Sequence, residues 1–132
     1  MIGLDTNILL RFILRDDPIQ YAKAERLLRD RIGPGAPGYI SIVVLVEFAW
    51  TLRRTAKFPN EKIRETVQKL LEVETLVFER AMTVAHALAI SRRAGIDVPD
   101  ALIAAIGQED GCTATLTFDA PFAQSGEAEL LV

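Results

Sequence analysis

Residues 2–13, with the sequence IGLDTNILLRFI, decide the fold, because the spacing of their apolar residues changes at Asp5 from a short run to a helical repeat. Residues 2–4 form a short apolar run, and beyond Asp5 the apolar side chains, among them Ile8 and Phe12, recur at helical spacing. This pattern predicts a strand that leads into Asp5 and a helix that follows it directly.

The alternation of short apolar runs and longer helical stretches continues along the chain. Pro18 suits the first turn of a second helix, and the sequence GPGAPG at residues 33–38 forces a loop. Strands that alternate with helices favour a parallel sheet covered on both faces. We therefore predict an α/β fold, a three-layer α/β/α sandwich with a short, mostly parallel central sheet. The further expected elements are strands at residues 39–41, 75–78, 112–117 and 130–132, and helices at residues 43–56, 61–72, 82–94 and 99–109.

Length and composition set the class of protein. The 132 residues suit a single domain over residues 1–132, and 50% hydrophobic with 25% charged residues is a globular composition. No uncharged run is long enough to cross a bilayer, and residues 1–5 lack the basic start of a secretory signal. The single cysteine, Cys112, forms no internal disulfide and is expected to be buried in a strand. These features favour a cytoplasmic protein without a membrane anchor.

Four acidic residues stand at the edges of apolar stretches: Asp5, Glu47, Asp100 and Asp119. In parallel sheets, ligands bind beyond the carboxyl ends of the strands, and both Asp5 and Asp119 follow predicted strands there. Carboxylates removed from water need protonation, a basic partner or a metal ion. If the fold brings the four together, one or two divalent cations with oxygen ligands are the simplest solution.

Each acid also has a purely structural interpretation. Asp5 suits the N-cap of the following helix, and Asp119 suits a turn or a cap. Asp97 and Asp100 resemble a cap followed by an acidic first turn, and we assign Asp97 to that role. Glu47 projects from an apolar helix face, where a salt bridge to an arginine such as Arg54 is the structural alternative.

Four motifs in order carry a family resemblance that covers nearly the whole chain. They are Leu4-Asp5-Thr6-Asn7, Val46-Glu47-Phe48, Pro99-Asp100-Ala101-Leu102-Ile103-Ala104-Ala105 and Leu116-Thr117-Phe118-Asp119-Ala120-Pro121-Phe122. On these residues the chain resembles the PIN-domain ribonucleases, and among them the VapC-type toxins of toxin–antitoxin pairs. The chain departs from the family at Ala120-Pro121, where a polar or basic residue is common, so RNA contacts near that loop are in doubt.

The resemblance implies a Mg²⁺-dependent or Mn²⁺-dependent endoribonuclease, in which water activated by the metal hydrolyses the phosphodiester bond and leaves 5′-phosphate ends. It assigns the metal ligands to Asp5, Glu47, Asp100 and Asp119, with a supporting role for Thr117. Asn7 is a candidate for orienting water, and an ordinary helix-surface amide is its alternative. The implied partners are RNA, a small antitoxin protein and a second copy in a homodimer.

The basic residues suggest local contacts with RNA phosphates and not binding by overall positive charge. The net charge of −3 argues against binding driven by bulk positive charge, although arginine outnumbers lysine by eleven to four. Candidate phosphate contacts are Arg11, Arg15, Arg53 and Arg54, and solvated helix faces are the alternative.

Three other classes of protein share features with this sequence. A phosphoacceptor receiver domain needs a lysine late in the chain, and none follows Lys69. A dehalogenase-like phosphatase needs a second aspartate two positions beyond Asp5, where Asn7 stands. The remaining alternative is a PIN-fold binding module for protein or RNA that has little catalytic activity, which the presence of all four acids argues against.

Overall fold

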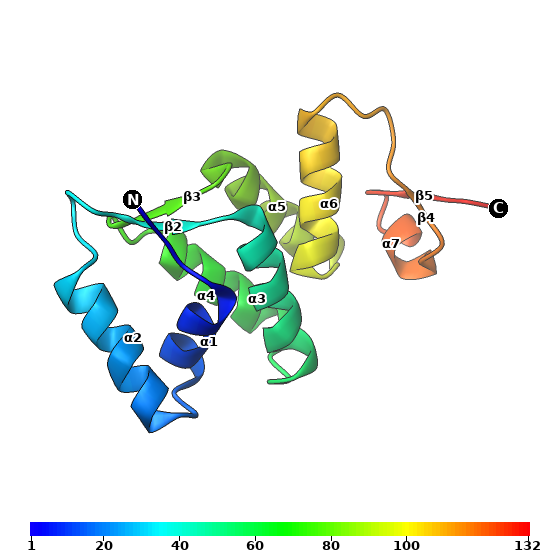
Figure 1. Ribbon diagram of the computed structural model, residues 1–132. Helices are drawn as coiled ribbons and strands as arrows, with labels where there is room; N and C mark the ends of the chain where they lie inside the picture. Colours follow the sequence, from blue (N-terminus) through cyan, green and yellow to red (C-terminus); the bar gives the residue numbers. More distant parts are fainter.

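The computed structural model describes all 132 residues (Figure 1). Each helix that the sequence predicts is present, with its ends displaced by no more than two residues. The helices are α1 Thr6–Leu14, α2 Pro18–Asp30, α3 Ile42–Arg54, α4 Asn60–Leu71, α5 Ala81–Ala94, α6 Val98–Glu109 and α7 Ala120–Gln124. The strands are β1 Ile2–Gly3, β2 Gly38–Ile40, β3 Leu76–Phe78, β4 Leu116–Thr117 and β5 Glu129–Leu130.

A short parallel sheet in the order β1-β2-β3 lies among the helices. Ile2 pairs with Gly38, and Gly38 pairs in turn with Leu76. Gly38 is the residue that allows this close approach, because a Cβ there would lie 2.9 Å from the Leu4 side chain and 3.0 Å from that of Leu76. The predicted three-layer α/β/α fold with a short parallel sheet is confirmed.

Side-chain caps explain where the helices next to the sheet begin. The Asp5 carboxylate accepts a hydrogen bond of 2.8 Å from the Thr6 N–H, and α1 starts there. The Ser41 hydroxyl accepts from the Val44 N–H at 3.2 Å and caps α3 in the same way. Both helices therefore start directly after a strand, which fixes the direction in which their first turns point.

The hydrophobic core is built around α3. Leu45, Phe48 and Leu52 lie on one face of this helix and are fully buried. Helices α5 and α6 pack against each other more extensively than any other pair of elements, and both contribute fully buried side chains. The opposite face of α3 is left at the surface, and it carries Glu47.

The last fifth of the chain corrects three expectations. The strand predicted at residues 112–117 is reduced to Leu116–Thr117, because the first residues after α6 form a turn in which the Cys112 N–H donates to the Gly107 carbonyl at 2.8 Å. The interpretation of Cys112 as a buried strand residue is wrong, since its side chain is exposed. Helix α7 was not predicted, and the final strand ends at Leu130 instead of continuing to residue 132.

Strands β4 and β5 form a separate two-stranded parallel pair and do not join the three-stranded sheet. In Figure 1, β4, β5 and α7 lie beyond α6, on the side away from β1, β2 and β3. No helix is both long and apolar enough to cross a membrane.

Candidate active site

Asp5 and Glu47 stand on neighbouring elements. Asp5 follows β1 at the carboxyl end of the sheet, and Glu47 lies in α3, which packs against α1. A cleft of about 750 Å³ is lined by side chains from both helices, and its polar side chains include Thr6, Asn7 and Glu47. The Thr6 hydroxyl is buried there without a hydrogen-bond partner. This part of the chain therefore presents several oxygen atoms to one cleft.

Asp100 and Asp119 form the second half of the candidate site. Asp100 lies half-buried in the first turn of α6, and Asp119 is exposed at the N-cap of α7, where its carboxylate accepts from the Phe122 N–H at 3.0 Å. Burial raises the pKa of the Asp100 carboxyl above its usual value, and the negative charges of Asp97 and Asp119 raise it further. These carboxylates are thus close enough to repel one another.

Asp97 has a different role from the one that the sequence indicated. It occupies the N-cap position of α6, but its side chain makes no capping hydrogen bond. Its carboxylate instead accepts from the Asn60 amide at 2.8 Å and pairs with Arg53 at 3.6 Å. Asp97 therefore joins α6 to α4 and to the end of α3.

The four predicted ligands are not gathered into one cage in a single chain. No group of three or more histidine, cysteine, aspartate or glutamate side chains is placed to hold a metal ion. The division of the sheet gives the reason, because β4 does not pair with β1 and so Asp119 does not lie beside Asp5. Three of the four acids, Asp5, Glu47 and Asp119, are also exposed, so the cost of burial alone does not require a cation.

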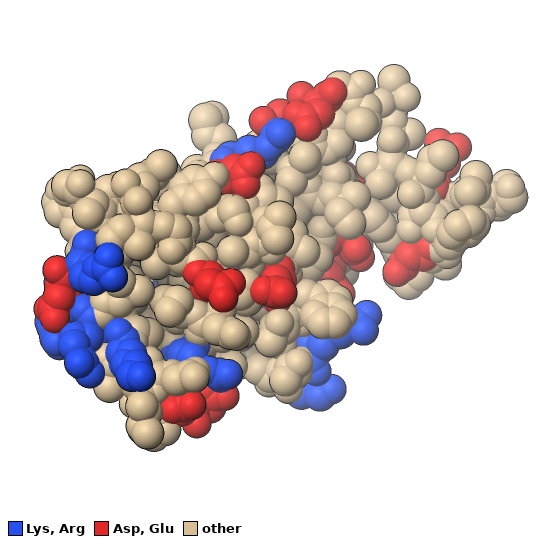
Figure 2. Space-filling model, viewed as in Figure 1, with Lys and Arg blue, Asp and Glu red and all other residues tan.

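The ion pairs nevertheless set these four acids apart from many others in the chain. Seven other carboxylates are paired with arginine: Asp16, Glu25, Asp30, Asp97, Glu109, Asp110 and Glu127. None of the four candidates has such a partner, which also excludes the salt bridge between Glu47 and Arg54. Figure 2 shows acidic groups in a row across this face, from the start of α1 over α3 to the C-terminal elements. Oxygen donors without a basic partner suit Mg²⁺ or Mn²⁺.

The two supporting residues lie next to the acids. The Thr117 hydroxyl accepts a hydrogen bond of 3.0 Å from the backbone N–H of Asp119, which holds the turn that presents the Asp119 carboxylate. Asn7 is exposed and lines the same cleft as Glu47. Thr117 stays a candidate for supporting the site, and the exposure of Asn7 fits both a water-orienting residue and an ordinary helix-surface amide.

The four candidate arginines divide into two kinds. Arg11 pairs with Asp16 at 3.0 Å, and Arg53 pairs with Asp97, so these two guanidinium groups already have acidic partners. Arg15 lies 4.9 Å from the centre of the Tyr21 ring, and Arg54 lies 4.6 Å from that of Trp50; neither takes part in an ion pair. The second two keep their charge available for an external anion. The stacking on Trp50 was not foreseen, although the spacing i,i+4 of the two residues would have allowed it to be expected.

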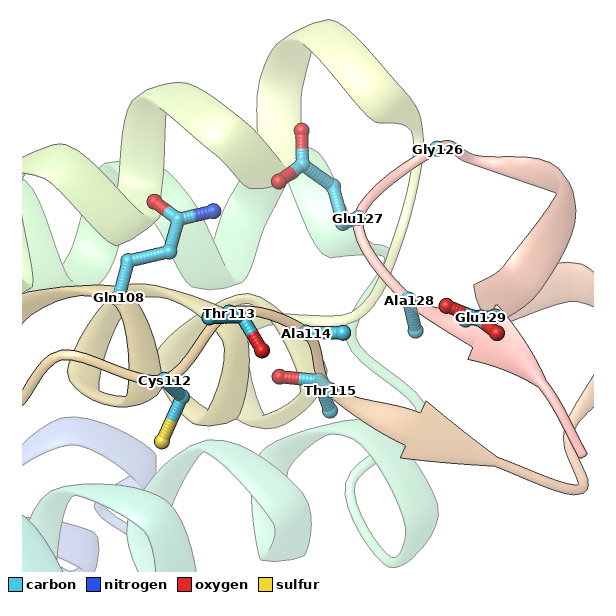
Figure 3. A pocket seen from close by; sticks show the side chains of 9 residues that line it. All are labelled: Gln108, Cys112, Thr113, Ala114, Thr115, Gly126, Glu127, Ala128 and Glu129. Atoms are coloured by element: carbon cyan, nitrogen blue, oxygen red, sulfur yellow. The ribbon is translucent and has the colours of Figure 1, made fainter.

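Another hollow, of about 310 Å³, lies between the end of α6 and the C-terminal strands (Figure 3). Gln108, Thr115 and Glu127 line it, and none of the four candidate acids does. Figure 3 shows the Cys112 side chain directed away from Thr113 and Thr115. The only histidine, His86, is exposed on α5 and lines a different hollow, in which none of the four candidate acids takes part. Neither residue adds a nucleophile or a base to the candidate site.

Comparison with known protein families identifies a PIN domain over residues 2–127. The chain belongs to the PIN domain family. PIN domains are generally nucleases, they typically use divalent metal ions, and a PIN nuclease domain implies an RNA substrate. A search of curated proteins found no significant match. The family therefore supports a nuclease site on this fold. The metal dependence and the biological role have to be argued from the residues described above.

Replacing Asp100 with asparagine is expected to stabilise the protein in the absence of metal. The folded state holds this carboxylate against desolvation and two like charges, and the amide removes that cost. Because the group is half-exposed and solvent screens it, the gain at neutral pH is less than about 1 kcal/mol, or a few degrees in Tm. Thermal unfolding of both proteins over a pH series measures it.

The pH dependence of this gain has a definite sign. The pKa of Asp100 is raised in the folded state, so the folded protein binds more protons and the wild type loses stability as the pH rises through that pKa. Below the ordinary value of 3.8 the carboxyl is protonated in both states, and the two proteins should then unfold at similar temperatures. A gain of the same size at every pH would contradict the electrostatic explanation.

Proposed function

We propose that the chain is a metal-dependent endoribonuclease that hydrolyses RNA phosphodiester bonds and acts as the toxin of a toxin–antitoxin pair. The observation that supports the proposal is that the chain is a PIN domain over residues 2–127 and that the four acids of its motifs each lack a basic partner. We also propose that residues 1–132 form one nuclease domain and that it works in the cytoplasm, where RNA is the substrate at hand.

In this proposal Asp5, Glu47, Asp100 and Asp119 hold Mg²⁺ or Mn²⁺. The ion would lower the pKa of a water molecule and neutralise charge that builds on the phosphate. Thr117 fixes the Asp119 turn through its hydroxyl, and the Asn7 amide orients water at the mouth of the α1/α3 cleft. No side chain is needed as a covalent nucleophile in this proposal.

The RNA backbone is proposed to contact the arginines near the cleft. Arg15 and Arg54 have no acidic partner, and each is stacked on an aromatic ring that limits its freedom before RNA binds. Arg11 and Arg53 would have to exchange a carboxylate for a phosphate oxygen. We therefore expect the first two to contribute more to RNA affinity than the second two.

The antitoxin is proposed to occupy the cleft between α1 and α3. Its apolar part is lined by Val43, Val46 and Trp50, and the side chains of Val43 and Trp50 are 78% and 49% exposed. An exposed apolar surface beside a charged site is typical of a place where another protein binds. A segment that fills this cleft would cover Glu47 and keep RNA away from it. A homodimer is the second proposed assembly.

Induction of the chain in a bacterial host tests the activity directly. New 5′-phosphate RNA ends at discrete positions, together with growth arrest, are expected. The purified protein should produce the same ends with Mg²⁺ and lose that activity when a chelator is added. A soluble protein that yields no new ends in the cell and does not cut isolated cellular RNA with Mg²⁺ or Mn²⁺ would contradict the proposal.

One observation favours the alternative of a PIN-fold binding module. The four acids do not form a metal cage within one chain, as a module that had lost cleavage would also show. The two functions differ in the test above, because a binding module should retain RNA or protein and leave the RNA ends unchanged.

A further inference from the structure

Helix α3 presents one stripe of side chains to the cleft that it shares with α1. Val43, Val46, Glu47 and Trp50 follow the spacing of a single helix face, and all four line this cleft of about 750 Å³. The Trp50 side chain is 49% exposed, although tryptophan is highly buried on average in folded proteins. The stripe therefore places an uncovered aromatic ring beside an acid of the candidate site.

Arg54 leaves part of the Trp50 ring open to the cleft. The guanidinium carbon of Arg54 lies 4.6 Å from the ring centre, but Arg54 does not line the cleft, so it does not cover the part of the ring that does. The contact limits the freedom of both side chains before anything binds. An aromatic face beside a guanidinium group without an ion-pair partner suits a stacked base together with its phosphate.

The α1 side of the cleft contributes polar groups. The Thr6 side chain lines the cleft and is only 4% exposed, and its hydroxyl makes no hydrogen bond within the chain. A buried hydroxyl without a partner is costly, and a bound polar group would relieve that cost. Asn7 adds an exposed amide, which can donate and accept hydrogen bonds. The cleft thus combines an aromatic and apolar wall on α3 with an unmet need for hydrogen bonds on α1.

Positive charge lies close to the α1 side as well. A neighbouring hollow of about 290 Å³ shares Asn7 with the cleft, and Arg11 and Lys23 also line it. Lys23 takes part in no ion pair. Figure 2 shows basic groups gathered on the side of the molecule where α2 lies, next to the row of acidic groups. In a chain of net charge −3, this local surface favours a polyanion over a neutral ligand.

We propose that the cleft between α1 and α3 holds one unpaired nucleobase of the RNA substrate, stacked on Trp50. A nucleobase has an apolar face and a polar edge, which match Trp50 on one wall and the Thr6 hydroxyl on the other. An apolar protein side chain would match the first wall and leave the hydroxyl without a partner. Because bases inside a duplex are already stacked and paired, the substrate class is single-stranded or looped RNA.

The position of this base relative to the cut bond rests on the proposed nuclease function. Trp50 lies three residues beyond Glu47 on the same helix face, where Cβ atoms are about 5–6 Å apart. The stacked base therefore belongs to a nucleotide next to the phosphate that is cut. An antitoxin segment in the same cleft would cover Trp50, so antitoxin and RNA base exclude each other.

The fluorescence of Trp50 tests the stacking directly, because it is the only tryptophan in the chain. The wild-type protein is titrated with a single-stranded RNA hexanucleotide, first in EDTA and then with Ca²⁺. Quenching is expected with this RNA. An abasic oligonucleotide of the same length and charge, and the matching RNA duplex, should quench little. Equal quenching by the abasic oligonucleotide, or none by the RNA under either condition, would overturn the proposal.

Variants of Trp50 measure what the ring contributes to RNA affinity. Fluorescence anisotropy with labelled RNA should show at least about five-fold weaker binding for Trp50→Leu, the lower end of what base–aromatic stacking contributes. Trp50→Phe keeps an aromatic face and should retain most of the affinity. Met82→Ala replaces an apolar side chain on α5 that is 89% exposed, and it should bind RNA as the wild type does. Wild-type affinity in Trp50→Leu would assign the ring to a protein partner and overturn the base pocket.

The outcomes also separate the base pocket from the nuclease proposal. RNA cleavage without base-dependent quenching would leave the nuclease standing and remove the pocket. Base-dependent quenching by a protein that cuts no RNA with Mg²⁺ or Mn²⁺ would remove the nuclease and leave the pocket on a binding module.

Discussion

Replacement of Asp5 with asparagine is expected to abolish RNA cleavage while the protein remains folded. Asparagine caps a helix about as well as aspartate, so it can keep the hydrogen bond to the Thr6 N–H and preserve the start of α1. It removes the negative charge that a divalent ion requires. Electrostatic stabilisation by such an ion is worth several kcal/mol, and each ~1.4 kcal/mol is a factor of ten, so the rate should fall by at least about 100-fold.

The same substitution at the next helix provides the matched control. Asp17 caps α2 and accepts from the Gln20 N–H at 3.0 Å, as Asp5 does for α1, but it lies outside the candidate site. Asp17→Asn should therefore cleave RNA at the wild-type rate. Cleavage rates with Mg²⁺ and circular dichroism of both variants make the comparison. If Asp5→Asn retained wild-type cleavage, the assignment of Asp5 as a metal ligand would be wrong.

The sequence predicted the first 109 residues well because local and global signals agree there. Apolar runs, helical periodicity and turn residues each pointed to the same elements, and Pro18 stands where α2 begins, whereas Ser41, which was placed in the strand, caps α3. The family match over residues 2–127 confirms the resemblance that the four motifs carried, at the level of the PIN domain. Where several independent signals coincide, a single sequence is sufficient to place the elements of this fold.

The C-terminal part was predicted less well for a physical reason. Residues 112–117 have the composition of a strand, but only Leu116–Thr117 finds a hydrogen-bonded neighbour, because a strand depends on a partner that the sequence does not name. Asp119 was correctly considered as a cap, yet the helix that it caps, α7, has only five residues and too short a pattern to detect. The same dependence on pairing determines whether Asp119 meets Asp5, and so it limits what the sequence can say about the site.

Two adjacent residues of α3 should separate function from stability most clearly. Glu47→Gln is expected to reduce RNA cleavage by at least about 100-fold with little change in Tm, because Glu47 is exposed and has no hydrogen-bond or ion-pair partner to lose. Phe48→Ala should instead lower the free energy of unfolding and leave RNA cleavage nearly unchanged. Phe48 is fully buried among the core residues of α3, and its truncation costs about 3–5 kcal/mol, or about 10 °C or more in Tm.

The pair is informative because both changes lie on one turn of one helix. Thermal unfolding and RNA cleavage well below the Tm, measured on both variants, give four results from a single element. Cleavage by Phe48→Ala at low temperature should stay near the wild-type rate, since the side chain contacts the core and not the cleft. A large fall in Tm for Glu47→Gln would assign Glu47 to the structure of α3. Preserved stability with lost cleavage would instead place its carboxylate in the chemistry, because an exposed side chain with no partner in the folded chain has no other interaction to lose.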